Sequence, residues 1–175
     1  MTEVIIVQDG QLLRSMDVQA GQRTDMVLLV MPGVSCDVKL DVHLVGEGAE
    51  ANVYGAYVCG GEEKVKIAVD MYHDVPHCNS RQLFKGIAGG VSKVDLYGKI
   101  IVAQDAQRTE AYQENHNILL TDGAKASLFT NCMDLRMRKL LLWRGGRKNM
   151  PVLFSKEFGI SQEQMYQLGV FDVFL

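Results

Sequence analysis

The sequence predicts an all-β protein built from short strands. Val, Ile and Leu are abundant, and 17 glycines accompany only 3 prolines, a composition that suits strands joined by tight turns. Two segments, Lys93–Val102 and Asn115–Leu120, alternate apolar and polar residues, and each ends at a polar or glycine-containing turn. Turns also recur at intervals of about 14 residues or multiples of that spacing, at Gly46, Gly60, Gly89 and Gly123. The chain therefore repeats one short structural unit, although the spacing drifts too much for a strict repeat.

The N-terminal strands are expected in the following order. Thr2–Val7 forms the first strand, and a polar stretch with a turn at Asp9-Gly10 follows as far as Gln22. Asp25–Met31 is a nearly continuous apolar run that ends at a Pro-Gly pair. Such a run is typical of a strand that is buried on both faces.

The middle strands show clearer alternation. One predicted strand places apolar side chains on one face at Val38, Leu40, Val42 and Leu44. Ala51–Cys59 forms the next strand and alternates less cleanly, whereas Val65–Met71 alternates well until Pro76 stops the run. Lys93–Val102 and Asn115–Leu120 repeat the arrangement, which indicates one apolar face throughout.

Two architectures fit short strands at this spacing: an antiparallel sandwich, and a coil of parallel strands stacked turn upon turn. Only Asp9-Gly10 and Asp122-Gly123 are good two-residue hairpin turns, so the residues alone leave both architectures open. A stacked coil exposes unpaired strand edges at its ends. In that architecture we expect a dimer.

Size and composition bound the class of protein. A chain of 175 residues is one domain that buries roughly 70% of its unfolded surface. The longest apolar run, Met26–Met31, is too short to span a membrane, and no charged-then-apolar leader opens the chain. We therefore expect a cytoplasmic protein that is not bound to a membrane.

The charge is unevenly distributed. The segment 136–148 carries six basic and no acidic residues, so the rest of the chain holds 12 basic and 21 acidic residues. A nucleic-acid surface normally extends over several elements, so we expect no nucleic acid as partner and read 136–148 as a cap or partner contact. The four cysteines, at 36, 59, 78 and 132, lack zinc-binding spacing and suit buried apolar positions in a reducing compartment.

Several motifs in the central stretch carry a resemblance to a known family. The first is made by His73, Pro76, His77, Cys78, Ser80, Phe84, Lys85 and Gly86. A strand, Tyr97-Gly98-Lys99-Ile100-Ile101-Val102, follows, and then come Ala106, Gln107, Thr109, Ala111, Gln113 and Asn115. The run closes with Leu119, Leu120, Asp122 and Ala124. Over about residues 35–126, these motifs resemble the SufB/SufD family of iron–sulfur cluster assembly scaffolds, and the chain is most SufD-like.

The resemblance implies a right-handed parallel β-helix and a non-enzymatic scaffold or interaction subunit of iron–sulfur cluster assembly. It implies a β-helix core over 1–126, followed by a divergent segment, 127–175, that forms a cap or short helix. The implied partners are a second copy, or a SufB/SufD-like paralogue, with an iron–sulfur cluster at an interface. A SufC-type ATPase is implied too. We expect it to bind weakly or not at all, because only Ile160–Tyr166 is similar to the helical segment that docks it.

The residues also suggest chemistry that must be weighed against structural roles. His73, His77 and Cys78 are candidate metal ligands beside Asp74, since iron and zinc take imidazole and thiolate ligands. Pro76 and the local spacing instead favour a structural turn whose polar groups bond to the backbone. A metal or cluster carrier acting through Cys78 or Cys132 is therefore one alternative.

A carbohydrate-acting β-helix enzyme is another alternative, with acidic candidates at Asp70, Asp95 and Asp105. Asn115 and Asn117 are expected to form amide ladders between turns of the coil. Such ladders would be structural rather than catalytic.

Overall fold

The computed structural model of the chain describes residues 1–132 and 140–144. Within these residues there are strands and turns but no helix, so no helix there is long and apolar enough to cross a membrane. The strands are β1 (Thr2–Val7), β2 (Gly10–Val18), β3 (Arg23–Val30), β4 (Cys36–Leu44), β5 (Glu50–Cys59), β6 (Lys64–His73), β7 (Asn79–Ala88), β8 (Lys93–Val102), β9 (Glu110–Leu119), β10 (Lys125–Cys132) and β11 (Leu140–Arg144).

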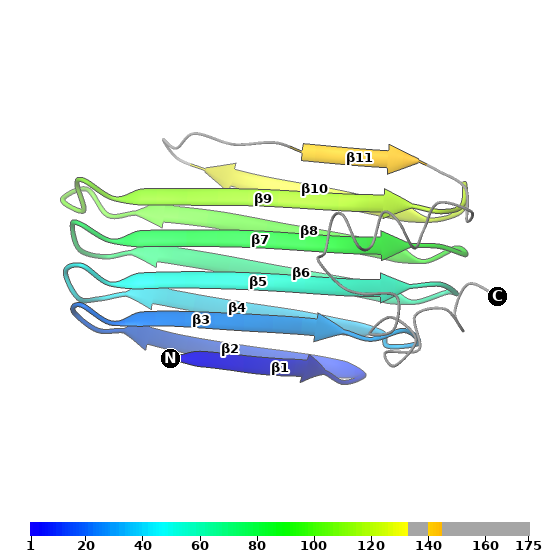
Figure 1. Ribbon diagram of the computed structural model, residues 1–175, viewed down its shortest axis with the longest axis horizontal. Helices are drawn as coiled ribbons and strands as arrows, with labels where there is room; N and C mark the ends of the chain where they lie inside the picture. The colour runs from blue at the N-terminus through cyan, green and yellow to red at the C-terminus, as the bar shows by residue number, and fades with distance from the viewer. Residues whose placement is uncertain (133–139, 145–175) are drawn as a thin grey trace.

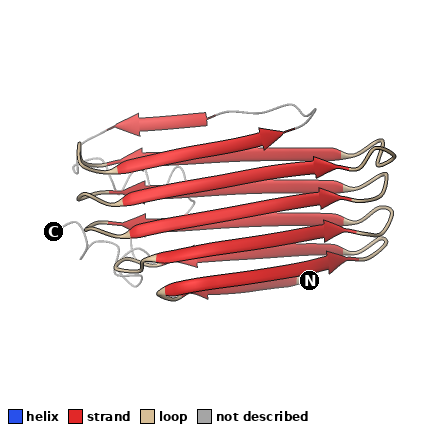
Figure 2. Cartoon of the chain, turned by 180° about the vertical axis from the view of Figure 1, so that it is seen from behind, coloured by secondary structure: helices blue, strands red, loops and turns tan. Residues whose placement is uncertain are grey.

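The strands form two parallel sheets that face each other (Figure 1). Odd-numbered strands make one sheet in the order β1-β3-β5-β7-β9-β11, and even-numbered strands make the other in the order β10-β8-β6-β4-β2. Figure 2, seen from behind, brings the even-numbered sheet to the front. Each strand therefore pairs with the strand two positions away in sequence, which makes the chain a β-solenoid of about four turns.

The coil is right-handed. In Figure 1 the odd-numbered strands run from left to right nearer the viewer, and the even-numbered strands return behind them as the chain climbs. This is the hand that parallel crossover connections adopt. The parallel β-helix implied by the resemblance is confirmed, and the antiparallel sandwich is wrong.

The register explains the spacing of the glycine turns. Cys36 pairs with Val65 and Lys64 pairs with Lys93, each 29 positions further along the chain. One coil thus takes 29 residues in the middle of the molecule, and a turn lies at each half coil. Coils become longer toward β10, where Val94 pairs with Ala126, 32 positions away. This growth in coil length produces the drift from a strict repeat.

The core is the space between the two sheets. Aliphatic side chains from successive coils stack in rows along it, as in the row Val38, Ile67 and Leu96, all at most 3% exposed. Parallel pairing places equivalent positions of neighbouring strands side by side. Burial of these rows is the main stabilising contribution to the solenoid.

Three strands lie in segments whose residue patterns predict polar stretches, turns or a divergent segment: β2, β7 and β10. β2 still alternates, with Leu12, Met16 and Val18 in core-facing register, but Arg14 occupies the core-facing position between them. Arg14 is half-exposed and forms an ion pair with Glu3 of β1 at 2.7 Å. This ion pair lies between β1 and β2, at the N-terminal end of the solenoid. That charge hides the strand pattern from a search for apolar alternation.

The two expected hairpin turns join strands that belong to opposite sheets. Asp9-Gly10 leads from β1 to β2, and Asp122-Gly123 leads from β9 to β10. The solenoid also continues past residue 126, because β10 pairs with β8 and β11 pairs with β9. Apart from β11, the remainder of the basic segment 136–148 and the similarity at 160–166 lie outside the described residues.

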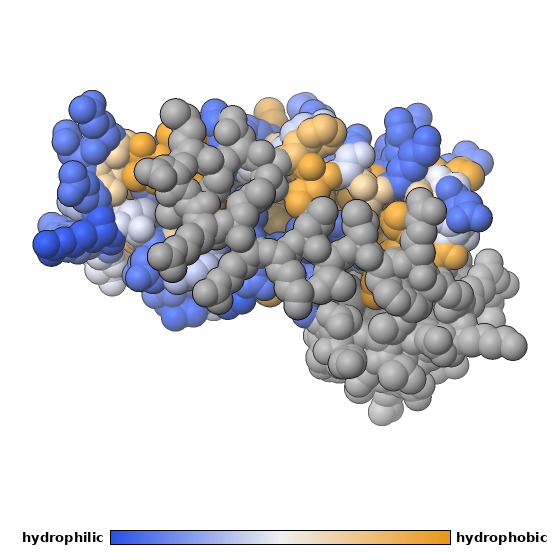
Figure 3. All heavy atoms as spheres, turned by 90° about the horizontal axis from the view of Figure 1, so that it is seen from above, coloured by the Kyte–Doolittle hydropathy of each residue, from blue (hydrophilic) through white to orange (hydrophobic). Residues whose placement is uncertain are grey.

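Hydrophilic side chains gather at one end of the molecule, on the left of Figure 3. This is the end where the turn between β8 and β9 lies in Figure 1, with exposed residues at Gln104, Asp105, Gln107 and Arg108. The predicted metal ligands occupy the neighbouring turn at the same end.

Candidate functional site

The predicted ligands His73, His77 and Cys78 surround the turn between β6 and β7. His73 is the last residue of β6 and points into the core, where it is fully buried in a row with Leu44 and Val102. Its Nε2 lies 2.8 Å from the hydroxyl of Ser80, and its Nδ1 has no partner among the described residues. Burial lowers the pKa of His73 to about 4. The imidazole is therefore neutral at physiological pH.

His77 and Cys78 face different environments. His77 has a left-handed backbone with φ of 61° and a side chain that is 43% exposed, 3.7 Å from the carboxylate of Glu47. Cys78 is fully buried, and its thiol donates to the carbonyl of Gly46 at 3.4 Å. Burial raises the pKa of the Cys78 thiol, so the protonated, unreactive form predominates near neutral pH.

The turn stacks on its neighbours through main-chain hydrogen bonds. The N–H of Asp74 donates to Leu44 in the preceding coil, and the N–H of His77 donates to Gln107 in the following coil, at 3.2 and 3.0 Å. The thiol contact of Cys78 with Gly46 adds a link to the preceding turn. The first motif of the resemblance therefore ties three successive turns together.

In the described part of the chain, no three His, Cys, Asp or Glu side chains come close enough to hold a metal ion. The turn presents one buried imidazole, one exposed imidazole and one buried thiol that point to different surroundings. Ligation by His73, His77 and Cys78 stays a prediction.

The other motif residues build the interior. Tyr57 on β5 donates a hydrogen bond to the amide oxygen of Asn117 on β9. Its ring fills the space beside Gly86 on β7, the strand between them. Asn115 lies in register with Phe84 rather than with another amide, so the expected ladder does not form there. An amide pair in register occurs instead at Gln82 and Gln113.

The three acidic candidates do not meet. Asp70 and Asp95 both lie on the outer face of the even-numbered sheet, but Asp70 pairs with Lys99, four positions beyond Asp95. At 3.3 Å per residue they are about 13 Å apart along the strand, beyond the spacing of paired glycosidase carboxylates. Asp105 lies in the exposed turn after β8.

A feature that sequence reasoning missed is an aromatic pair on the outer face of the even-numbered sheet. The rings of Tyr97 on β8 and Phe129 on β10 stack with centroids 4.7 Å apart and an interplanar angle of 10°. They are 36% and 50% exposed. Alternation predicts that each ring points outward, but the register that brings the two together spans 32 residues.

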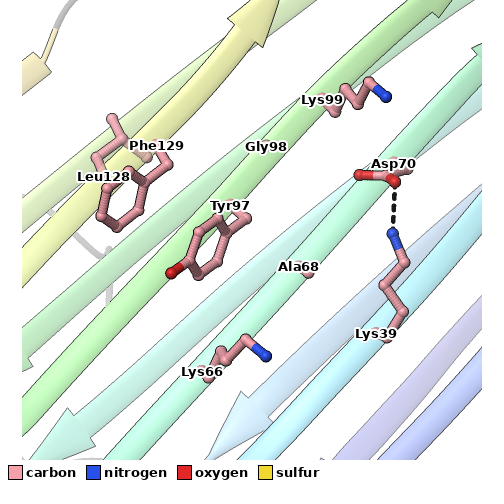
Figure 4. A pocket seen from close by; sticks show the side chains of 9 residues that line it. All are labelled: Lys39, Lys66, Ala68, Asp70, Tyr97, Gly98, Lys99, Leu128 and Phe129. Carbon is pink, nitrogen blue, oxygen red and sulfur yellow. Dashed lines mark hydrogen bonds and ion pairs between the residues drawn. The ribbon is translucent and has the colours of Figure 1, made fainter.

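The aromatic pair borders an open depression of about 610 Å³. Figure 4 shows the Tyr97 ring between Phe129 and the small side chain of Ala68, with Lys66 and Lys99 on either side. Lys39 bonds Asp70 beside the depression and also lies 3.1 Å from Asp41. This surface can stack on a flat group and can bind an anion.

Fold and side chains together define a two-sheet, right-handed β-solenoid whose motif residues pack its core and fasten its turns. A comparison with protein-family models matches residues 14–129 to the SUF system FeS cluster assembly, SufBD core domain. The match runs from within β2 into β10. The chain belongs to this SufBD family.

The curated relatives of this chain carry the same family name. Proteins of Mycobacterium tuberculosis and Mycobacterium bovis named as iron-sulfur cluster assembly SufBD family proteins are each 26% identical over 112 residues. That stretch is 60% of this chain and 28% of each relative. The protein of the same name from Mycobacterium leprae is 25% identical over 112 residues, which are 60% of this chain and 29% of the relative. The match thus spans less than a third of the relatives' length.

Proposed function

We propose that this chain acts in iron–sulfur cluster assembly as a SufB/SufD-like, non-enzymatic scaffold or interaction subunit. The observation that carries the proposal is the family match over 14–129, which coincides with the coils of the solenoid. The names of the mycobacterial relatives support the same process. As the resemblance of its motifs implies, we propose a SufD-like protein that works in the cytoplasm.

The geometry supports a scaffold role through what the motif residues do. Phe84, Gly86 and Gly98 shape the interior, while His73 and Cys78 are buried in protonation states suited to packing. A rigid coil with a filled interior presents surfaces to partners. The cluster would then be cargo that is assembled where this chain meets another subunit.

The ends of the solenoid supply a place for such pairing. Among the strands that the structure describes, β1 and β2 each pair with another strand on one side only. Their outward side chains include Val4, Ile6 and Leu13, which are 59%, 56% and 65% exposed. Unpaired edges with apolar neighbours favour association with another chain. We propose a homodimer or a heterodimer with a SufB/SufD-like paralogue, and only weak contact with a SufC-type ATPase.

Anaerobic co-purification tests the proposal. The tagged chain is expressed with SufB-type, SufD-type and SufC-type proteins of one organism, and the complex is assayed for iron and sulfide. We expect a SufB- or SufD-type subunit to co-purify in a defined ratio, with Leu13→Asp weakening its recovery and Leu83→Asp on the other sheet serving as control. A chain that remains monomeric and recovers neither subunit would contradict the proposal.

Reconstitution of the chain alone with iron and sulfide separates the scaffold from a carrier acting through Cys78. A scaffold that completes its site with a partner gives the same weak visible absorption for the wild type and for Cys78→Ala. A wild-type absorption band that Cys78→Ala abolishes would establish the carrier, and His73→Ala and His77→Ala would then identify the other ligands.

A further inference from the structure

The outer face of β6, β8 and β10 carries an unusual row of like charges. Lys64, Lys93 and Lys125 are direct register partners on three neighbouring strands, with adjacent strands about 4.8 Å apart. All three are exposed, and none has an ion pair among the described residues. Like charges directly opposite each other destabilise a sheet. The row, here called the lysine row, therefore costs stability in the isolated chain.

The lysine row belongs to a basic surface on an otherwise acidic protein. The outward side chains described on β6, β8 and β10 include five lysines and two aspartates, whereas the whole chain has a net charge of −3. Lys99 also lacks an ion pair among the described residues, and Lys66 bonds Asp37 at 3.0 Å. A second depression, of about 510 Å³, contains Lys64 and Lys93 and shares Lys66 with the depression beside Tyr97.

A slot for a flat ring adjoins this surface. Lys39, Ala68 and Tyr97 are register partners on β4, β6 and β8, so Lys39 and Tyr97 stand about 9.6 Å apart with only a methyl group between them. A ring over Ala68 would lie one strand spacing from Tyr97, within the range of aromatic stacking. It would extend the existing Tyr97–Phe129 stack by one member, in the space that Figure 4 shows beside Tyr97.

We propose that this face binds an acidic segment of a partner protein, with an aromatic side chain of that segment stacked on Tyr97 over Ala68. Carboxylates of the segment would pair with the lysine row and with Lys99. The depression is open to solvent, so it would cover only part of a small molecule, whereas small-molecule sites bury most of the ligand surface. Asp70 and Asp95 interrupt the basic surface, which disfavours a continuous polyanion such as nucleic acid. The proposal does not depend on the role in cluster assembly.

Fluorescence anisotropy at low ionic strength tests the proposal with two labelled peptides, Glu-Asp-Glu-Trp-Glu-Asp-Glu and the same peptide with Ala in place of Trp. The Trp peptide is expected to bind about fivefold more tightly, the gain of one aromatic pair. Ala68→Phe fills the slot and should abolish this difference. Ala68→Ser leaves the slot open and should preserve it, which controls for substitution at this site.

The charge contribution is tested by Lys93→Glu, at the centre of the lysine row. It should weaken binding of both peptides about tenfold and raise the urea midpoint, because it relieves the repulsion from Lys64 and Lys125. Arg81→Glu, on the other sheet, changes the net charge equally and should leave both affinities unchanged. Equal binding of the two peptides, or equal effects of Lys93→Glu and Arg81→Glu, would overturn the proposal. Tighter binding of a thymidine decanucleotide would overturn it in favour of nucleic acid.

Discussion

The ring of Phe84 fills the space beside Gly55, its neighbour one coil earlier. The two residues are direct register partners on β7 and β5, and a Cβ added to Gly55 would overlap the Phe84 ring. Two positions further along the same strands, Tyr57 and Gly86 are paired in the same way. Here the ring lies on β5 and the glycine on β7. Paired rings and glycines thus keep the core volume constant from coil to coil, as close packing requires.

Gly55→Ala is expected to destabilise the protein by about 2–4 kcal/mol, because the added methyl overpacks a closed core. Urea unfolding measures the change in free energy. Gly61→Ala is the control, since the atoms nearest to a Cβ there belong to the Glu63 carboxylate and lie at ordinary contact distance. The double variant Gly55→Ala/Phe84→Leu should recover part of the loss. Equal effects at Gly55 and Gly61 would show that the ring does not fill this space.

Glu63 should stabilise the turns at the end of the solenoid opposite the predicted ligand turn. Its carboxylate accepts hydrogen bonds from the N–H groups of Gly33, Gly60 and Gly61, at 3.1, 3.1 and 2.7 Å. Burial alone would raise the pKa of Glu63, but these donors outweigh it and hold the pKa below its ordinary value of 4.5. Its ionisation therefore stabilises the fold above pH 4.5, and the contribution is lost as the pH falls through the lower folded pKa.

Glu63→Gln is accordingly expected to lower the free energy of unfolding by about 1–3 kcal/mol at pH 7, and by less as the pH falls below 4.5. Urea titrations across this range measure the difference. Glu62→Gln, at an exposed neighbouring position, is the matched control and should change little. A loss at Glu63 that is independent of pH would contradict the assigned role of its charge.

His73 should make the protein acid-sensitive at a higher pH than Glu63 does. Its folded pKa is lowered from 6.5 to about 4 by burial, so the neutral ring contributes stability that is complete above pH 6.5 and is lost between pH 6.5 and 4. This pKa shift contributes on the order of 3 kcal/mol to the pH dependence of the free energy of unfolding. His73→Leu matches its register partner Leu44 and should remove this dependence. Identical pH profiles for the wild type and His73→Leu would refute the buried neutral ring.

The thiols described in the core should resist alkylation in the native state. Burial raises the pKa of Cys36 to about 11 and of Cys59 to about 12, and also raises that of Cys78. In a Cys132→Ala background, these three thiols should react with a thiol reagent at pH 8 far more slowly than in urea, because little thiolate forms and access is blocked. Mass spectrometry would locate any modification. Rapid native labelling of Cys78 would revive the carrier hypothesis.

Much of the solenoid was accessible from the sequence, because an outward polar residue and an inward aliphatic residue alternate in most strands. The predicted Thr2–Val7 and Lys93–Val102 match β1 and β8 residue for residue. β7 escaped prediction since its inward positions hold Ser80, Gln82 and Gly86 beside Phe84. Such residues break the apolar pattern. In the core, Ser80 lies against the His73 ring, Gln82 is in register with Gln113, and Gly86 lies beside the Tyr57 ring.

The candidate sites were less predictable for the same reason. Sequence proximity grouped His73, His77 and Cys78, but strand alternation and the turn send their side chains into different surroundings. The Tyr97–Phe129 pair and the lysine row involve residues a whole coil apart. Their contact depends on coil length, and insertions in the turns alter that length without changing the strands.

By itself the sequence determined the all-β class, the half-coil spacing and, through its motifs, the family. Local propensity and side-chain alternation are properties of a few adjacent residues, so they can be read along the chain. Only the tertiary structure decided which residues become neighbours across coils: which ring lies on which glycine, which lysines face one another, and which predicted ligands separate. Those contacts depend on register, and register is set by packing two sheets around one shared core.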